Sequence, residues 1–111
     1  MSTPVIANLE KMVGTPRDGE LLRYALGNEY LKSGDFATAA RHLQAAVAFN
    51  PRHSAAWKLL GKALDGAGDR PAALEAYRQG IEMAEQRGDI QAVKEMRVFA
   101  RRLEKTINSA A

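Results

Sequence analysis

Apolar and small residues recur every three or four positions along most of this chain, a spacing that places them on one face of an α-helix. One such set includes Trp57, Leu60 and Leu64, and another includes Ala39 and Leu43. Sets of this kind bury one side of a helix against a neighbour and leave the other side in water. The pattern therefore predicts an all-α fold built from short amphipathic helices.

The helical pattern occurs twice, and the two copies are 34 positions apart. A period of this length is typical of a unit made of two helices joined by a turn. The identical residues fall where two packed helices need particular side-chain sizes, so we interpret the repeat as two stacked helix pairs. The residues that return unchanged are Leu26, Gly27, Gly34, Asp35 and Ala39 in the first unit and Leu60, Gly61, Gly68, Asp69 and Ala73 in the second.

Two of the repeated glycines, Gly27 and Gly61, lie inside the predicted first helices. A glycine there costs roughly 1 kcal/mol relative to alanine, so we expect a compensating close approach of the second helix, opposite Ala39 and Ala73. The glycine–aspartate pairs further on are expected to end one helix and cap the next. Each unit is thus predicted to be a tight antiparallel helix pair.

Counted from Glu20 and Ser54 as first positions, the two units resemble the tetratricopeptide repeat. Its signature places tryptophan, leucine–glycine, tyrosine, alanine, phenylalanine, alanine and proline at fixed offsets. The matching residues are Leu26, Gly27, Tyr30, Ala39, Ala46 and Pro51 in the first unit and Trp57, Leu60, Gly61 and Ala73 in the second. The substituted positions hold Arg23, Leu43, Leu64, Tyr77 and Glu85. The resemblance covers residues 20–87, and the whole plan is similar to that of a small stand-alone bacterial tetratricopeptide repeat protein.

The segments outside the repeats are predicted to be helices that cover the open ends of the stack. Apolar residues keep helical spacing over residues 4–13, and Asp89 is placed to cap a helix that runs to about Ile107. The inner face of that last helix is predicted to hold Ala92, Val93, Met96, Phe99, Ala100, Leu103 and Ile107. We divide the chain into an N-terminal capping helix and turn (1–19), repeat 1 (20–53), repeat 2 (54–87) and a C-terminal amphipathic capping helix (88–111).

Composition favours one compact domain that carries no catalytic chemistry. The chain has 111 residues, enough for one core, and no cysteine for disulfides, thiolate catalysis or thiolate metal ligation. His42 and His53 have no partner at the short spacing of a metal site or triad, and we expect His53 to be exposed. We therefore predict a non-enzymatic protein with no metal and no cofactor. Because the chain has no apolar run of about 18 residues, we also expect it to be cytoplasmic.

The resemblance implies a binding groove along the first helices. The family's groove positions fall on Leu21, Tyr24, Asn28, Leu31, Ala55, Lys58, Lys62 and Asp65. We single out Tyr24, whose ring the core should not need, together with Asn28, Lys58, Lys62 and Asp65. The two lysines are placed to receive a carboxylate of an extended peptide or acidic helix, or else they only solubilise the surface. The family's carboxylate clamp for heat-shock protein termini is not indicated, because Asn28 alone fits it and the other positions hold Tyr24, Leu59, Asp89 and Val93.

The outer face of the last predicted helix is basic, and the sequence pI is about 9.4. The simple interpretation is a solvated face on which Glu95 and Glu104 form local ion pairs. The alternative is weak electrostatic binding to nucleic acid or an anionic membrane surface. The sequence does not favour nucleic acid as the partner, because no aromatic side chain lies among the cations for base stacking. This basic stripe consists of Lys94, Arg97, Arg101, Arg102 and Lys105.

The sequence thus favours a protein–protein interaction module of the scaffold, adaptor or co-chaperone-like kind. Its partner would be an unidentified protein or peptide, acidic if the groove lysines bind it. Two repeats offer less surface than the three or more that are usual, so self-association is a further variant.

Overall fold

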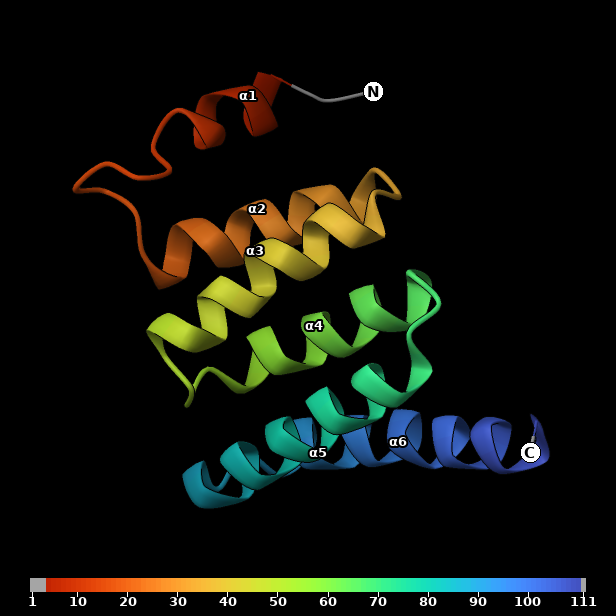
Figure 1. Ribbon diagram of the computed structural model, residues 1–111. Coiled ribbons are helices and arrows are strands. Elements are labelled where there is room, and N and C mark those ends of the chain that lie inside the picture. Colours follow the sequence, from red (N-terminus) through yellow and green to blue (C-terminus); the bar gives the residue numbers. More distant parts are fainter. Residues whose placement is uncertain (1–3, 111) are drawn as a thin grey trace.

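The computed structural model describes residues 4–110, and this part of the chain folds into six α-helices (Figure 1). They are α1 (Pro4–Glu10), α2 (Glu20–Lys32), α3 (Phe36–Phe49), α4 (Ser54–Gly66), α5 (Arg70–Arg87) and α6 (Ile90–Ala110). The helices stack from α1 at one end to α5 and α6 at the other, and the molecule measures 42 × 31 × 18 Å along its principal axes.

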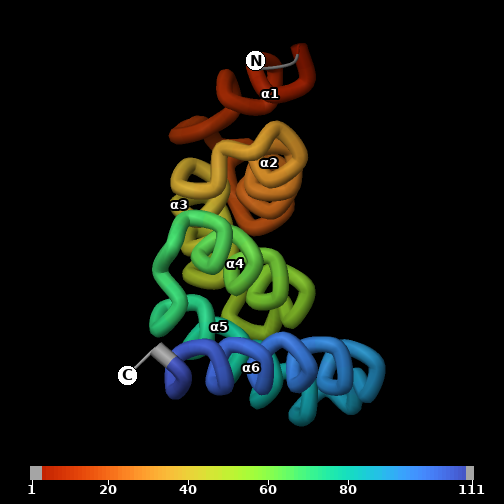
Figure 2. Tube along the Cα trace, turned by 90° about the vertical axis from the view of Figure 1, so that its right-hand side faces the viewer, coloured from red at the N-terminus to blue at the C-terminus, as the bar shows by residue number. Residues whose placement is uncertain are grey.

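The stack is built from two antiparallel hairpins, α2 with α3 and α4 with α5. Contacts between α3 and α4 join the hairpins, and α6 packs along α5. Figure 2 shows the same order from the side, with each hairpin lying on the next. The all-α helical-repeat fold is therefore confirmed. Because α2 contacts α4, and α4 contacts α6, these three helices together form one face of the stack.

Each hairpin closes through a glycine turn and an aspartate cap, as predicted. Gly34 has a φ of 81°, and the N–H of Asp35 donates to the Tyr30 carbonyl at 3.0 Å. These are features of a Schellman motif, which satisfies the last carbonyl groups of a helix. The Asp35 carboxylate then accepts the Thr38 N–H at 3.3 Å and caps α3. In the second hairpin the N–H of Asp69 donates to the Leu64 carbonyl at 2.9 Å, and the Asp69 carboxylate accepts the Ala72 N–H at 3.1 Å.

The predicted close approach of the second helix at Gly27 and Gly61 is confirmed, and the atoms nearest to each glycine belong to a large side chain. A Cβ atom added to Gly27 would collide with the side chain of Leu43, and one added to Gly61 would lie 2.5 Å from Cε1 of Tyr77. Ala39 and Ala73, the predicted neighbours, are one helical turn before these two side chains. Helical side chains lean toward the N-terminus of their helix, so the large residue one turn after the alanine covers the glycine.

The N-terminal helix covers α2 but is shorter than predicted. It ends at Glu10, and residues 11–14 form turns that lead to Gly14, whose φ is 78°. Ile6 is 2% exposed and packs with Leu22 and Leu26. The turn after α1 is also held in place, because the Gly14 N–H donates to the Asp18 carboxylate at 2.9 Å. The turn thus replaces the last predicted helical turn, while α1 still shields the open side of α2.

The predicted inner face of the last helix is confirmed. Asp89 accepts the Ala92 N–H at 3.2 Å, and the helix continues past Ile107 to Ala110. The seven predicted residues all belong to the cluster that joins α5 and α6. Met96 lies at the centre of this contact and is fully buried. α6 therefore closes the end of the second hairpin.

Candidate functional site

The groove residues predicted for the first repeat lie on α2, and one of them is partly buried against the core. Tyr24 packs against the cluster between the hairpins, and its ring centroid is 4.6 Å from that of His53. His53 is half-buried, not exposed as expected: its Nδ1 lies 3.0 Å from Glu20 Oε2, without the alignment of a hydrogen bond. Asn50 donates to the same oxygen at 2.8 Å. Tyr24 is thus partly buried against the repeat core, which the sequence did not predict, and its ring contacts His53 in the connection between the two repeats.

Two other positions on α2 are available to a partner. Leu21 is 75% exposed, although burying such a side chain is worth roughly 1.5–3 kcal/mol. Asn28 is half-buried, and its side chain has no hydrogen bond to any residue that the structure describes. Leu21, Tyr24 and Asn28 follow one face of the helix at spacings of three and four residues. We call this row, together with Lys58, Lys62 and Asp65 of α4, the first-helix face.

The two lysines of α4 have different surroundings, although they are one turn apart. Lys58 Nζ is 3.6 Å from Glu95 Oε2 of α6, and its side chain is only 25% exposed. Lys62 is exposed and has its Nζ 5.4 Å from the centre of the Phe99 ring, within the range of a cation–π contact. Nothing in the sequence distinguishes these two lysines. In the structure Lys58 is paired with Glu95, whereas Lys62 has no ion-pair partner among residues 4–110.

Lys62 and Asp65 both line a pocket of about 450 Å³ between the end of α4, the start of α5 and the C-terminal half of α6. Arg102 of α6 lines the same pocket, so one residue of the basic stripe lies next to the end of the first-helix face. Arg70 also lines it and was missed, because no sequence motif places the first residue of α5 beside α6. The pocket is open to solvent and lies beyond α4 from the row on α2.

The remaining basic stripe is exposed, and its acidic neighbours do not neutralise it locally. Glu95 and Glu104 pair across helices instead, the second with Arg78 of α5 at 3.4 Å. Arg97 pairs with Glu85 of α5 at 2.8 Å. Within residues 4–110 the other exposed cations of this stripe have no ion-pair partner; they are Lys94, Arg101 and Lys105.

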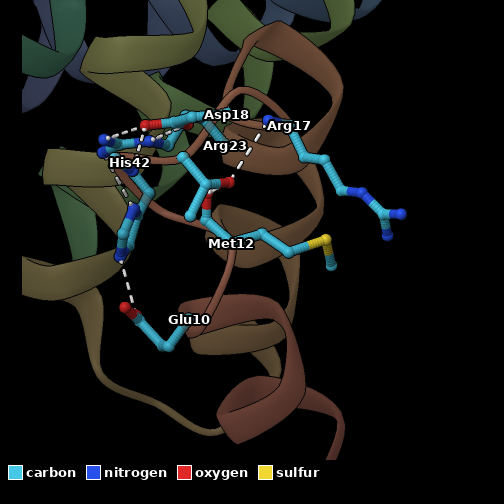
Figure 3. Close-up of polar contacts among 8 residues, drawn as sticks. Glu10, Met12, Arg17, Asp18, Arg23 and His42 are labelled. Atoms are coloured by element: carbon cyan, nitrogen blue, oxygen red, sulfur yellow. Dashed lines mark hydrogen bonds and ion pairs between the residues drawn. The ribbon is translucent and has the colours of Figure 1, made fainter.

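A polar network that the sequence did not predict holds the N-terminal segment to the first hairpin (Figure 3). Glu10 Oε1 accepts hydrogen bonds from the Tyr30 hydroxyl at 2.8 Å and from His42 Nε2 at 3.1 Å. With Nε2 as donor, His42 Nδ1 accepts from Arg23 at 3.4 Å. Arg23 in turn donates to both Asp18 oxygens, at 2.8 and 2.9 Å. The one feature of the sequence that could have indicated this network is Arg23, a charged residue at the tryptophan position of the repeat signature.

The network shifts the pKa of Asp18, Arg23 and Tyr30. The side-chain hydrogen bond from Arg23, with help from the Gly14 N–H, lowers the pKa of the Asp18 carboxyl far below its usual range. The same bond raises the pKa of Arg23. The hydrogen bond to Glu10 raises the pKa of the Tyr30 hydroxyl, since the donated proton becomes harder to remove. These groups are bonded to one another inside the fold, so we assign the network a structural role.

Neither metal-binding geometry nor a membrane-spanning helix is found in the described residues. Among residues 4–110, no group of three or more histidine, aspartate or glutamate side chains is arranged to hold a metal ion. In the same range no helix is both long and apolar enough to cross a membrane.

The fold and this surface define a class, the all-α helical-repeat proteins that present one face of a short stack. The chain belongs to the tetratricopeptide repeat family, whose sequence profile matches residues 24–89. Repeats of this family are general protein–protein interaction modules and are typically non-enzymatic. Membership in the family confirms the resemblance read from the repeat signature.

Related proteins of similar length are known in bacteria. The chain is 50% identical over 101 residues to a TPR repeat-containing protein of Pseudomonas aeruginosa. The aligned residues cover 91% of this chain and 96% of the relative. A solution structure of a Bordetella parapertussis protein is 44% identical with a TM-score of 0.79, over 95% of this chain and 91% of that one. A tetratricopeptide repeat domain from Salinibacter ruber is 28% identical with a TM-score of 0.72, over 81% and 90%.

Proposed function

We propose that this protein is an adaptor whose first-helix face binds a peptide segment of a partner protein. The observation that carries the proposal is Leu21, which is 75% exposed and lies on the same face of α2 as Asn28, an asparagine with free hydrogen-bonding capacity. An extended peptide can cover the leucine with a side chain and engage Asn28 through its backbone, the usual division of roles in peptide recognition. A protein partner fits this mixture of apolar and amide groups better than a purely charged ligand does.

The residues of the first-helix face would contribute to peptide binding in different ways. Tyr24 is held by His53 on one side, so its exposed edge is a rigid contact that loses little entropy on binding. Lys58 is already paired with Glu95 and contributes less than its neighbour. Lys62 and Asp65 offer charges of both signs at the far end of the face. A bound peptide would therefore run from α2 across α4.

The test is selection of peptides from a display library of random heptapeptides on the immobilised protein. Synthetic copies of the selected peptides are then titrated by calorimetry against wild type, Leu21→Glu and Val98→Glu. Val98 is the matched control, because it is 43% exposed and lies on the outer side of α6. We expect Leu21→Glu to weaken binding roughly tenfold or more and the control to leave it unchanged. If no peptide is enriched, or if the two variants bind alike, the proposal is wrong.

A second candidate function rests on the exposed and unpaired cations Lys94, Arg101 and Lys105. These could attract a polyanion, and such binding weakens steeply as salt is added. Arg97 pairs with Glu85, and Arg102 lines the pocket, so the stripe is smaller than the sequence implied. Retention on heparin, compared between wild type and the Lys94→Glu/Lys105→Glu variant, tests this function. Retention that is weak and equal in both proteins would rule it out.

A further inference from the structure

The pocket at the end of the first-helix face has a composition that points to a particular ligand group. Three cations surround it, Lys62 from α4, Arg70 from α5 and Arg102 from α6. Phe99 forms an apolar part of the wall, and Asp65 supplies one carboxylate. Both Figure 1 and Figure 2 place the turn between α4 and α5 on the same side of the stack as the C-terminal end of α6.

The cations of this pocket are unpaired, unlike several others on the same helices. All three are exposed, and none has an ion-pair partner among residues 4–110. By contrast, Lys58 and Arg97 each have a carboxylate within 4 Å. Like charges gathered around one open pocket repel each other, and an anion placed between them relieves that repulsion. The pocket therefore favours an anionic group as ligand.

Asp65 decides which kind of anion fits. It lowers the positive potential, which disfavours a phosphate with two negative charges or a chain of phosphates more than it disfavours a single carboxylate. A carboxylate oxygen is also an acceptor for a backbone N–H, which a peptide carries next to every side chain. The two guanidinium groups present planar pairs of donors that match a carboxylate. Phe99 offers contact to an apolar side chain in the same segment.

We propose that this pocket binds a carboxylate group of an acidic peptide segment, with Arg102, Arg70 and Lys62 as donors and Asp65 as acceptor of a peptide N–H. The inference rests on the proposed function, because it adds a ligand class at one end of the same face. It also makes the closing helix part of the specificity site, since Arg102 belongs to α6, whereas Lys62 and Arg70 belong to the second repeat.

The experiment uses the same heptapeptide library on wild type, on a Lys62→Met/Arg102→Met variant and on a Lys11→Met/Arg41→Met variant. Methionine keeps an apolar stem of similar length, and all four positions are exposed, so the fold is expected to survive; circular dichroism verifies this. The third protein is the matched control, because it also loses one lysine and one arginine, both at exposed positions outside the pocket and outside the basic stripe. The selected peptides, their glutamine or asparagine versions and tripolyphosphate are then titrated by calorimetry.

We expect peptides selected on wild type to be enriched in aspartate or glutamate, and the pocket variant to bind them at least tenfold more weakly than wild type. The control variant should bind as wild type does, and removing the peptide carboxylate should produce the same loss as removing the cations. Selected peptides without acidic residues that still depend on Leu21 would overturn this inference and leave the proposed function intact. Tighter binding of tripolyphosphate than of any peptide would also overturn it. Failure to select any peptide would reject both.

Discussion

At the scale of single residues, the two repeats differ at the tryptophan position of the signature, which is aromatic in the second repeat and charged in the first. Trp57 occupies the signature position in the second repeat and donates its ring N–H to the Pro51 carbonyl at 2.7 Å. Arg23 occupies the same position in the first repeat and binds Asp18 with two hydrogen bonds. The substitution connects the first repeat to the segment that precedes it, because Asp18 also holds Gly14.

The pair of Arg23 and Asp18 makes part of the stability depend on pH. The folded pKa of Asp18 lies below its unfolded value, so the contribution is fully present above about pH 4 and is lost as pH falls toward the folded pKa. We expect Asp18→Asn to lower the urea midpoint at pH 7, and the difference from wild type to shrink at pH 3 and below. A difference that stays constant from pH 7 to pH 2.5 would contradict this. Glu82→Gln, at an exposed position, is the control.

At the scale of elements, a hairpin is specified by a glycine on one helix and a large side chain on the other. Leu43 lies against Gly27, and the Tyr77 ring lies against Gly61. The approach brings the helix backbones close enough for the buried residues of both helices to pack. Because a glycine is unfavourable in a helix, its presence in both repeats indicates that the space above it is needed by the partner side chain.

Filling that space should therefore destabilise the hairpin. We expect Gly61→Ala to lower the free energy of unfolding by about 1–3 kcal/mol, although alanine is the better helix former by about 1 kcal/mol. Urea unfolding measures the change. Gly19→Ala is the control, since a Cβ there meets nothing within 4 Å and the backbone is extended. In a Tyr77→Ala background the cost of Gly61→Ala should shrink, and equal costs in the two backgrounds would refute the assigned contact.

At the scale of the whole molecule, the sequence predicts what short-range patterns encode and misses what the stack brings together. The helix faces, the glycine turns and the aspartate caps all depend on residues within one or two turns of each other. Glu10 and His42 are 32 residues apart, and the ion pair of Lys58 with Glu95 joins α4 to α6. Contacts of this kind depend on how the helices are placed in space. For the same reason the groove lysines looked alike in the sequence, and the pocket with Arg70 could not be predicted.

The stack also implies that its two ends differ in local stability. α1 has seven residues and is held by a small cluster and the network around Glu10, whereas α6 has 21 residues and packs along α5 through a larger buried cluster. Segments with few buried contacts open locally without global unfolding. In native-state hydrogen exchange followed by NMR, we therefore expect α1 amides to be less protected than those of α4 and α5.

Replacing Glu10 separates this local opening from the stability of the repeats. Glu10→Ala removes the acceptor for Tyr30 and His42, so it should lower protection in α1 and in the turn up to Asp18, while α4 and α5 keep wild-type protection. Glu29→Ala, which removes only a surface pair with Lys32, should change neither region. A uniform loss of protection in Glu10→Ala would mean that the N-terminal segment and the repeats unfold as one unit. A local loss would show that the first repeat can expose Leu22 and Leu26 to a partner while the rest of the stack stays folded.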